Sequence, residues 1–194
     1  MLLSKKKRQE YLKALGFYKG NIDGIVGAKT KKAYLELQKK YFPHYVNKKN
    51  QWDGKYGTNT DKLLRNAYNV KMYCPNFKLE EFKCGCKGKH CTGYPAVLDI
   101  QLLKNVQATR NKFGPTTIPS GLRCSKHNSA VGGVVLSRHK SGKAVDIKNV
   151  VSATVQGRKQ IMSFWKTLPK WRYTYCDING SNPNMGSSVH GDVK

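Results

Sequence analysis

Two side chains that bind zinc lie close together in residues 137–147, which read SRHKSGKAVDI. His139 and Asp146 are seven positions apart, and Gly142 between them allows the chain to fold back so that both reach one ion. Imidazole and carboxylate groups both coordinate zinc, and a catalytic zinc takes three protein ligands and a water. The third ligand must come from farther along the chain, and His190 is the candidate. Such residues are also common as surface polar groups, so the spacing alone leaves two interpretations open: a zinc site formed by His139, Asp146 and His190, or a polar surface.

A zinc ion held by two imidazoles and one carboxylate suits hydrolysis. It polarises a scissile carbonyl and lowers the pKa of its bound water. Two neutral ligands and one anionic ligand leave the centre cationic, which favours a developing oxyanion.

The composition predicts a globular protein with an anionic partner. The chain has 194 residues, of which 36 are Lys or Arg and 11 are Asp or Glu, so its formal net charge is +25. Such a charge favours nucleic acid, an anionic membrane surface or an acidic wall polymer. The N-terminal residues MLLSKKKR contain no apolar segment of usable length. We therefore expect no signal peptide and no membrane insertion, synthesis in the cytoplasm, and a monomer.

The first part of the chain reads as three helices joined by two similar loops. Apolar spacing predicts helices over residues 7–15 and from Thr30 to Tyr41, and a third begins near Thr60. The phrase Asp-Gly-x-x-Gly-x-x-Thr occurs at residues 23–30 and again at 53–60. Each copy predicts a tight loop that leads into a helix, with its threonine near the N-cap.

The second part reads as α+β. We expect helices over residues 97–111 and 153–168, and strands at 117–118, 144–147, 172–176 and 189–193. Helices that precede most of the strands favour an antiparallel sheet. Residues 66–76 show no clear periodicity and contain Pro75. We therefore place a first domain at residues 4–66, a linker at 67–76 and a second domain at 77–194.

Residues 8–64 resemble the three-helix peptidoglycan-binding domain found on bacterial wall hydrolases. Besides the two repeated loops, the resemblance rests on Gln9, Leu12, Leu15-Gly16-Phe17-Tyr18, Gly20, Ala33 and Gln38. It implies that peptidoglycan is the partner, and that the binding residues include Tyr18, Asp23, Gly24, Asp53 and Gly54. The connection at residues 42–51 is longer than usual for this domain.

Residues 77–194 resemble the M15 family of zinc metallopeptidases, in particular its small D-alanyl-D-alanine carboxypeptidase-like domain. The resemblance rests on the phrases Phe77-Lys78-Leu79-x-Glu81-Phe82, Ser120-Gly121-x-Arg123-Cys124, His127-Asn128, Gly132-Gly133, Ser137-x-His139-x-x-Gly142-x-Ala144-x-Asp146-Ile147 and Val189-His190-x-Asp192. It implies that His139, Asp146 and His190 hold the zinc and that Arg123 anchors or polarises the substrate. Ser137 either holds the loop of His139 or contacts the substrate.

The two resemblances together imply a peptidoglycan hydrolase of the phage endolysin kind, which acts on the wall after its release. The bond cleaved would be an amide of the peptide stem or cross-link. D,D-carboxypeptidase, D,D-endopeptidase and L-Ala-D-Glu endopeptidase activities all remain open.

The general base departs from the family pattern. Many relatives have an acid three positions before the last histidine, where this chain has Ser187. Among the acids of the second part, Asp177 and Asp192 have no other assigned role. Asp192 shares a strand face with His190 and is either the base or a carboxylate that orients a ligand imidazole. Asp177 lies in a loop rich in Gly, Asn and Pro that could reach over the metal.

Three of the six cysteines cluster at Cys84, Cys86 and Cys91, next to His90. They either bind a structural zinc or remain reduced thiols packed near a loop, and disulfides stay open as well.

Two other functions compete with the enzyme. Ser187 favours a non-catalytic wall-binding protein whose peptidase domain has lost its base. Charge alone favours a nucleic-acid-binding protein, but no zinc-finger, RNA-recognition or helix-turn-helix phrase accompanies it, so we expect no specific nucleic-acid partner.

Overall fold

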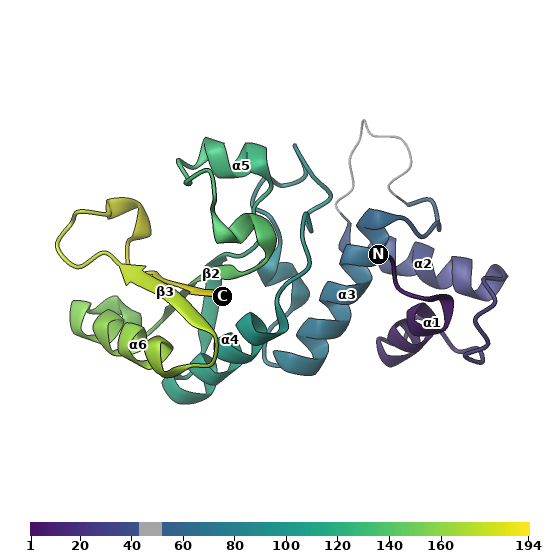
Figure 1. Cartoon of the computed structure of the whole chain (residues 1–194), viewed down its shortest axis with the longest axis horizontal. Coiled ribbons are helices and arrows are strands. Elements are labelled where there is room, and N and C mark those ends of the chain that lie inside the picture. Colours follow the sequence, from purple (N-terminus) through teal and green to yellow (C-terminus); the bar gives the residue numbers. More distant parts are fainter. Residues whose placement is uncertain (43–51) are drawn as a thin grey trace.

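The computed structural model describes residues 1–42 and 52–194 of the chain. Three helices form its N-terminal part, α1 (Lys5–Ala14), α2 (Ala28–Tyr41) and α3 (Thr58–Tyr73) (Figure 1). Their shared interior contains fully buried apolar side chains such as Leu12 and Leu37. The predicted three-helix arrangement is therefore confirmed. Apart from Phe42, the long connection predicted at residues 42–51 lies outside the described residues.

A buried glutamine explains the first copy of the repeated phrase. Gln9 on α1 donates from Nε2 to Asp23 Oδ1 (2.8 Å) and to the carbonyl oxygen of Ile25 (3.1 Å). Its own carbonyl oxygen accepts from the backbone N–H of Gly24 (2.7 Å), and Nε2 also reaches Thr30 Oγ1 (3.4 Å). One side chain thus ties the loop to the helices on either side of it.

The second copy repeats this network around Gln38 on α2. Gln38 Nε2 donates to Asp53 Oδ1 (2.9 Å), to the carbonyl oxygen of Lys55 (3.0 Å) and to Thr60 Oγ1 (3.0 Å). Its carbonyl oxygen accepts from the N–H of Gly54 (2.9 Å). Gln9 precedes Asp23 by 14 residues and Gln38 precedes Asp53 by 15, so the repeated unit extends from glutamine to threonine with a difference of one residue.

Helix α3 continues through most of the residues predicted as a linker. It ends at Tyr73, and it buries Asn66, Ala67, Asn69 and Val70. The expectation of an aperiodic linker at 67–76 is therefore wrong for residues 67–73, because buried asparagines hide the helical period. Asn66 donates to the carbonyl oxygen of Ala96 (2.9 Å) and accepts from the N–H of Leu98 (2.7 Å), so α3 also supports the following part of the chain.

The remaining elements follow one another in an α+β order, which confirms the predicted fold class. In chain order they are η1 (Leu79–Phe82), α4 (Ile100–Phe113), β1 (Thr116–Ser120), α5 (Ser125–Ala130), η2 (Arg138–Ser141), β2 (Ala144–Asn149), η3 (Val151–Ala153), α6 (Val155–Thr167), β3 (Trp171–Cys176), η4 (Pro183–Met185) and β4 (Val189–Val193). Asp99 and Thr154 cap the first turns of α4 and α6 with their side chains.

The four strands form an antiparallel sheet in the order β1-β2-β4-β3. Its register places Ser120, Asp146, His190 and Tyr175 side by side, one on each strand. Residues directly opposite each other in antiparallel strands project from the same face. One row across the sheet therefore carries polar and aromatic side chains on a common face.

The opposite face of the sheet packs against helices, and Gly191 fits this contact closely. A Cβ atom at Gly191 would lie 2.3 Å from the ring of Trp165, a fully buried residue of α6. The missing side chain lets β4 approach α6, which fixes the strand that carries His190 and Asp192. Among the helices of the described residues, none is both long and apolar enough to span a membrane.

Candidate active site

The structure brings together the three residues predicted to bind zinc. His139 lies in η2, Asp146 in β2 and His190 in β4, and all three are buried. One ligand atom from each lies within 4.8 Å of the others. Asp146 and His190 meet because they are paired across β2 and β4. His139 reaches them from the turn before β2, where Gly142 adopts a left-handed φ of +74°.

Hydrogen bonds decide which histidine nitrogens face the common centre. His139 Nδ1 lies 2.7 Å from the carbonyl oxygen of Gly121, so it donates there and its Nε2 is left as a ligand atom. That Nε2 lies 3.4 Å from Asp146 Oδ1, and His190 Nδ1 lies 2.9 Å from the same oxygen. The converging atoms are therefore His139 Nε2, His190 Nδ1 and Asp146 Oδ1.

Arg123 holds the other oxygen of the Asp146 carboxylate. Its Nη2 lies 2.8 Å from Asp146 Oδ2, and its Nε donates to Ser120 Oγ (2.9 Å). The guanidinium therefore directs Oδ1 toward the histidines. Because 17% of the Arg123 side chain is exposed, its other N–H groups can still reach a substrate.

Electrostatics favour an ionised carboxylate at this centre. Burial raises the pKa of Asp146, but the hydrogen bonds with His139 and His190 outweigh burial and hold that pKa below its ordinary value. Burial lowers the pKa of His190, whereas its contacts with Asp146 and Asp192 raise it, and the net direction is upward. The centre thus keeps an anion that attracts positive charge.

These residues fit a catalytic zinc. Two imidazole nitrogens and one carboxylate oxygen are the ligand types that such sites use, and three protein ligands leave a position open. The second nitrogen of His139 is fixed by a backbone carbonyl, as is usual for zinc-binding histidines. His139, Asp146 and His190 are therefore the residues that would hold the ion.

Asp192 lies behind His190 rather than beside the converging atoms. Its Oδ2 is 3.5 Å from His190 Nε2, on the side of the ring away from Asp146, and 3.0 Å from Arg172 Nη1. The Asp192 side chain is 3% exposed. Of the two roles that the sequence left open, this position favours orienting the imidazole over accepting a proton from water.

Among the described residues, Asp177, Ser187 and Ser137 take no part in the hydrogen bonds and ion pairs of this centre. Asp177 Oδ1 accepts from the N–H of Asn182 in the same loop (3.3 Å), and the carbonyl oxygen of Asp177 accepts from Nε of Arg158 on α6 (2.9 Å). Ser187 is half-buried in the segment before β4. Ser137 occupies the N-cap position of η2 without a side-chain cap hydrogen bond, and its backbone bonds to Val134 and Lys140.

Strand β3 supplies aromatic residues that the sequence did not single out. The ring of Tyr175 lies 4.8 Å from that of His190, centroid to centroid. Burial, followed by the negative charge of Asp146, raises the pKa of Tyr175. Thr174 donates from Oγ1 to the backbone carbonyl of His190. The alternating pattern of β3 could have placed Tyr175 on the polar face, but only the pairing with β4 shows that it meets His190.

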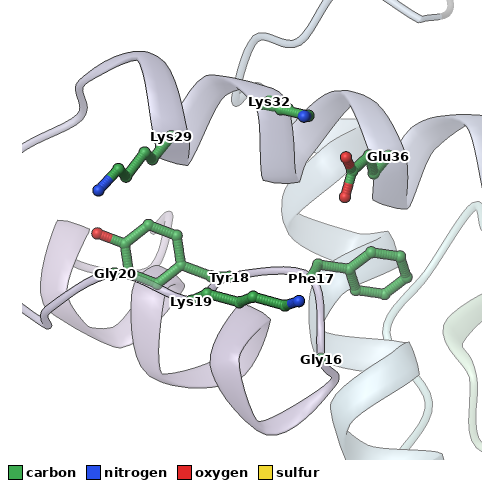
Figure 2. Close-up of a pocket in the computed structure, with 8 residues that line it drawn as sticks. All are labelled: Gly16, Phe17, Tyr18, Lys19, Gly20, Lys29, Lys32 and Glu36. Carbon is green, nitrogen blue, oxygen red and sulfur yellow. The ribbon is translucent and has the colours of Figure 1, made fainter.

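The N-terminal part contains a pocket of about 330 Å³ between the segment 16–20 and helix α2 (Figure 2). One side is lined by Gly16, Phe17, Tyr18, Lys19 and Gly20, and the other by Lys29, Lys32 and Glu36 of α2. Of the five residues predicted to bind the wall, Tyr18 is the one that lines this pocket.

The other four predicted wall-binding residues connect the loops to the helices, while the side chains of Asp23 and Asp53 stay exposed. Asp23 and Gly24 bond to Gln9, and Asp53 and Gly54 bond to Gln38. The hydrogen bond from Gln9 also lowers the pKa of Asp23. Through these contacts the repeated loops hold the helices together.

Two parts of the chain match known families. Residues 75–169 match the family model of Peptidase M15, and residues 6–64 match that of a putative peptidoglycan binding domain. No curated protein matches the chain closely enough to count as a relative. The peptidase match includes His139 and Asp146 and ends before His190. The chain therefore carries a segment similar to putative peptidoglycan binding domains, followed by a segment similar to Peptidase M15.

Proposed function

We propose that this protein is a zinc-dependent peptidoglycan hydrolase that cleaves an amide bond in the peptide stem or cross-link of the bacterial wall. One observation carries the proposal: His139 Nε2, His190 Nδ1 and Asp146 Oδ1 converge, and His139 and Asp146 lie in the segment that matches Peptidase M15. The peptidoglycan-binding domain supplies the substrate class. The amide that is cleaved defines one of the three activities that the resemblance implies, and all three stay open.

Each side chain of the centre has a definable task in this proposal. When bound, zinc supplies Lewis-acid chemistry, since it polarises a carbonyl and lowers the pKa of water. Gly121 orients His139, Arg123 orients Asp146, and Asp192 orients His190. The partly exposed Arg123 also offers a positive charge to a substrate carboxylate or to the oxygen that becomes negative during attack.

Attachment to the wall is assigned to the pocket between residues 16–20 and α2. Lys19, Lys29 and Lys32 offer cations to the carboxylates of the stem peptide, and Phe17 and Tyr18 offer apolar contact. The formal charge of +25 adds a general attraction to an anionic wall. We infer an endolysin-like role in which a monomer acts on the wall after release from the cell that made it.

A second function, wall binding without catalysis, is favoured by one specific observation. Ser187 stands where relatives often have an acid, and Asp192 faces the far side of His190. A chain without a proton acceptor would still bind zinc and peptidoglycan.

The test measures the release of peptide fragments from purified peptidoglycan by the full-length chain. We expect hydrolysis that stops on addition of a zinc chelator and resumes when zinc is restored. His139→Ala should abolish it, whereas His90→Ala should not, because His90 is exposed and lies outside the convergent group. Mass spectrometry of the fragments identifies the bond.

Zinc-loaded wild-type protein that sediments with peptidoglycan but releases no fragments would support the binding function instead. Hydrolysis that persists in His139→Ala would remove this residue from the centre.

A further inference from the structure

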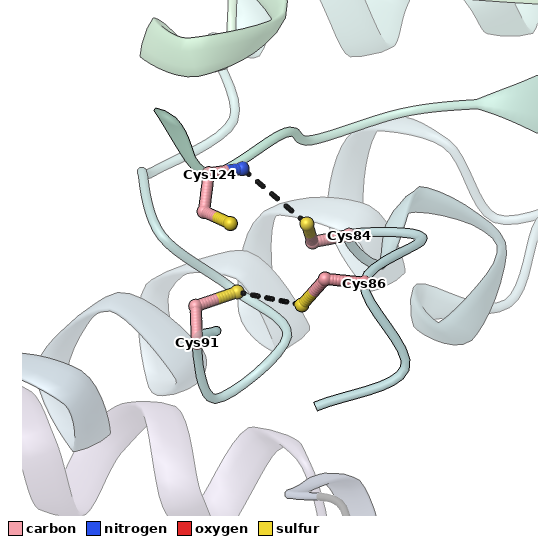
Figure 3. A group of neighbouring side chains, drawn as sticks. All are labelled: Cys84, Cys86, Cys91 and Cys124. Carbon is pink, nitrogen blue, oxygen red and sulfur yellow. Dashed lines mark hydrogen bonds between the residues drawn. The ribbon is translucent and has the colours of Figure 1, made fainter. Parts of the chain in front are cut away.

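Four cysteines converge at a place separate from the His–Asp–His centre (Figure 3). Cys84, Cys86 and Cys91 come from the loop after η1, and Cys124 precedes α5. All four Sγ atoms lie within 4.8 Å of one another, and those of Cys86 and Cys91 are 3.5 Å apart. The sequence pointed to His90 as a neighbour of the first three, but the fourth member of the group is Cys124.

We propose that Cys84, Cys86, Cys91 and Cys124 bind one structural zinc ion as a tetrathiolate site. Zinc takes four thiolates in a tetrahedron with Zn–S distances of about 2.3 Å, which places the sulfurs about 3.8 Å apart. The observed group already has nearly this size. Because four protein ligands fill the coordination sphere, the site leaves no position for substrate and is structural.

Backbone N–H groups surround the sulfurs as expected for thiolates. The N–H of Cys124 donates to Cys84 Sγ (3.3 Å), that of Gly93 to Cys91 Sγ (3.4 Å) and that of His127 to Cys124 Sγ (3.4 Å). Hydrogen bonds of this kind favour the charged form of the acceptor and orient metal ligands. Lys83, Lys87, Lys89 and Lys126 lie in the same two segments. Their charge opposes the net −2 of zinc with four thiolates.

The fold around the cysteines also calls for a cross-link. Residues 83–99 form neither helix nor strand, yet Cys84 and Cys86 are buried within this segment. Irregular segments of this length are uncommon in compact domains unless something holds them. Two disulfides would pair the sulfurs at about 2.0 Å, whereas here the four gather in a single group.

The proposed ion would join the loop after η1 to the segment that carries Arg123. The N–H of Leu122 already donates to the carbonyl oxygen of Phe82 (2.9 Å). Two residues farther along each segment, the N–H of Cys124 donates to Cys84 Sγ (3.3 Å). Arg123 is the neighbour of Cys124 and pairs with Asp146. A tetrathiolate zinc would therefore stabilise the backbone from which Arg123 reaches the other centre.

The first experiment determines zinc content and zinc ligands in the full-length protein, purified with a thiol reductant and without chelator. His139→Ala removes a ligand from the other centre, so the zinc that remains in this variant reports on the cysteine site alone. X-ray absorption of this variant should show one zinc per chain with four sulfur neighbours at about 2.3 Å.

A matched pair of double variants provides the second readout. Cys86→Ser with Cys91→Ser should lower the zinc content by one per chain. Cys74→Ser with Cys176→Ser should leave it unchanged, because both of these cysteines lie outside the group. The His139→Ala measurement needs no cysteine variant, so it decides the proposal even where the first double variant does not fold.

Three results would overturn the proposal: zinc without sulfur neighbours in His139→Ala, no zinc in that variant, or iron in place of zinc. One zinc per chain in the wild-type protein, with four sulfur neighbours, would instead support the cysteine site and remove zinc from the proposed catalytic centre. The two proposals therefore fail separately.

Discussion

Replacement of Asp192 by asparagine decides whether this residue orients a ligand or accepts a proton. Its Oδ2 contacts His190 Nε2 at 3.5 Å, while His190 Nδ1 faces Asp146. Loss of a carboxylate behind a zinc-binding histidine costs about 10- to 100-fold in metal affinity, or about 1.4–2.8 kcal/mol. We expect the lower end of this range for Asp192→Asn, because the asparagine oxygen can still accept a hydrogen bond from the imidazole.

The assay measures the zinc concentration that restores half of the hydrolytic activity after chelation. For Asp192→Asn this concentration should rise about tenfold, and excess zinc should restore near-normal turnover. Arg172→Gln is the matched control, since it removes the ion pair but leaves the carboxylate. Arg172 is half exposed, so its loss should shift the concentration by about threefold or less.

The reasoning fails if Asp192→Asn takes up zinc like the wild type while turnover falls by about a hundredfold or more and does not recover with added metal. That result is expected of a lost general base. Asp177→Asn, measured alongside, should retain both zinc affinity and turnover, because the carboxylate of Asp177 bonds within its own loop and its carbonyl oxygen bonds to Arg158.

Two further predictions concern the N-terminal part. Lys32→Glu places a negative charge in the pocket and should weaken sedimentation with peptidoglycan at about 0.3 M salt, where long-range attraction is screened. Lys166→Glu on α6 is the control, because it changes the net charge equally but lies outside the pocket, and it should not weaken sedimentation. Equal losses in both variants would mean that attachment is general charge attraction. Gln38→Ala removes four hydrogen bonds of 2.9–3.0 Å from a buried position and should lower the free energy of unfolding by about 2–4 kcal/mol in urea. Gln107 is half-buried and its side chain donates only at the surface, so Gln107→Ala should change the free energy of unfolding by less than about 1 kcal/mol. A similarly small effect at Gln38 would contradict its assigned role.

The sequence predicted the secondary structure well where residue type and period agree. The strands that carry Asp146 and His190 and the helices of the N-terminal part all form near the expected positions. The end of α3 was missed because Asn66 and Asn69 are buried polar residues, which period analysis counts as exposed. Their role depends on a partner such as the backbone at Ala96, which only the tertiary structure supplies.

The candidate site was predictable in its ligand types but not in its supporting residues. His139, Asp146 and His190 are typical zinc ligands in a recognisable order, so the sequence selects them. Tyr175 and Cys124 gain their neighbours from strand pairing and loop packing between segments far apart in the chain. No local pattern encodes such contacts, and a spacing of 33 residues between Cys91 and Cys124 resembles no common zinc motif.

Residues 121–124 connect the two candidate metal sites because they run between two loops and bond to both. The N–H of Leu122 bonds to Phe82 on one side, and the N–H of Arg123 bonds to the carbonyl oxygen of His139 (3.1 Å) on the other. Successive N–H groups of an extended chain point to opposite edges, so this segment pairs with both neighbours at once. The carbonyl of Gly121 then orients His139, and the side chain of Arg123 orients Asp146. A displacement of this segment would therefore disturb two of the three proposed zinc ligands together, although none of its residues is itself a ligand of that centre.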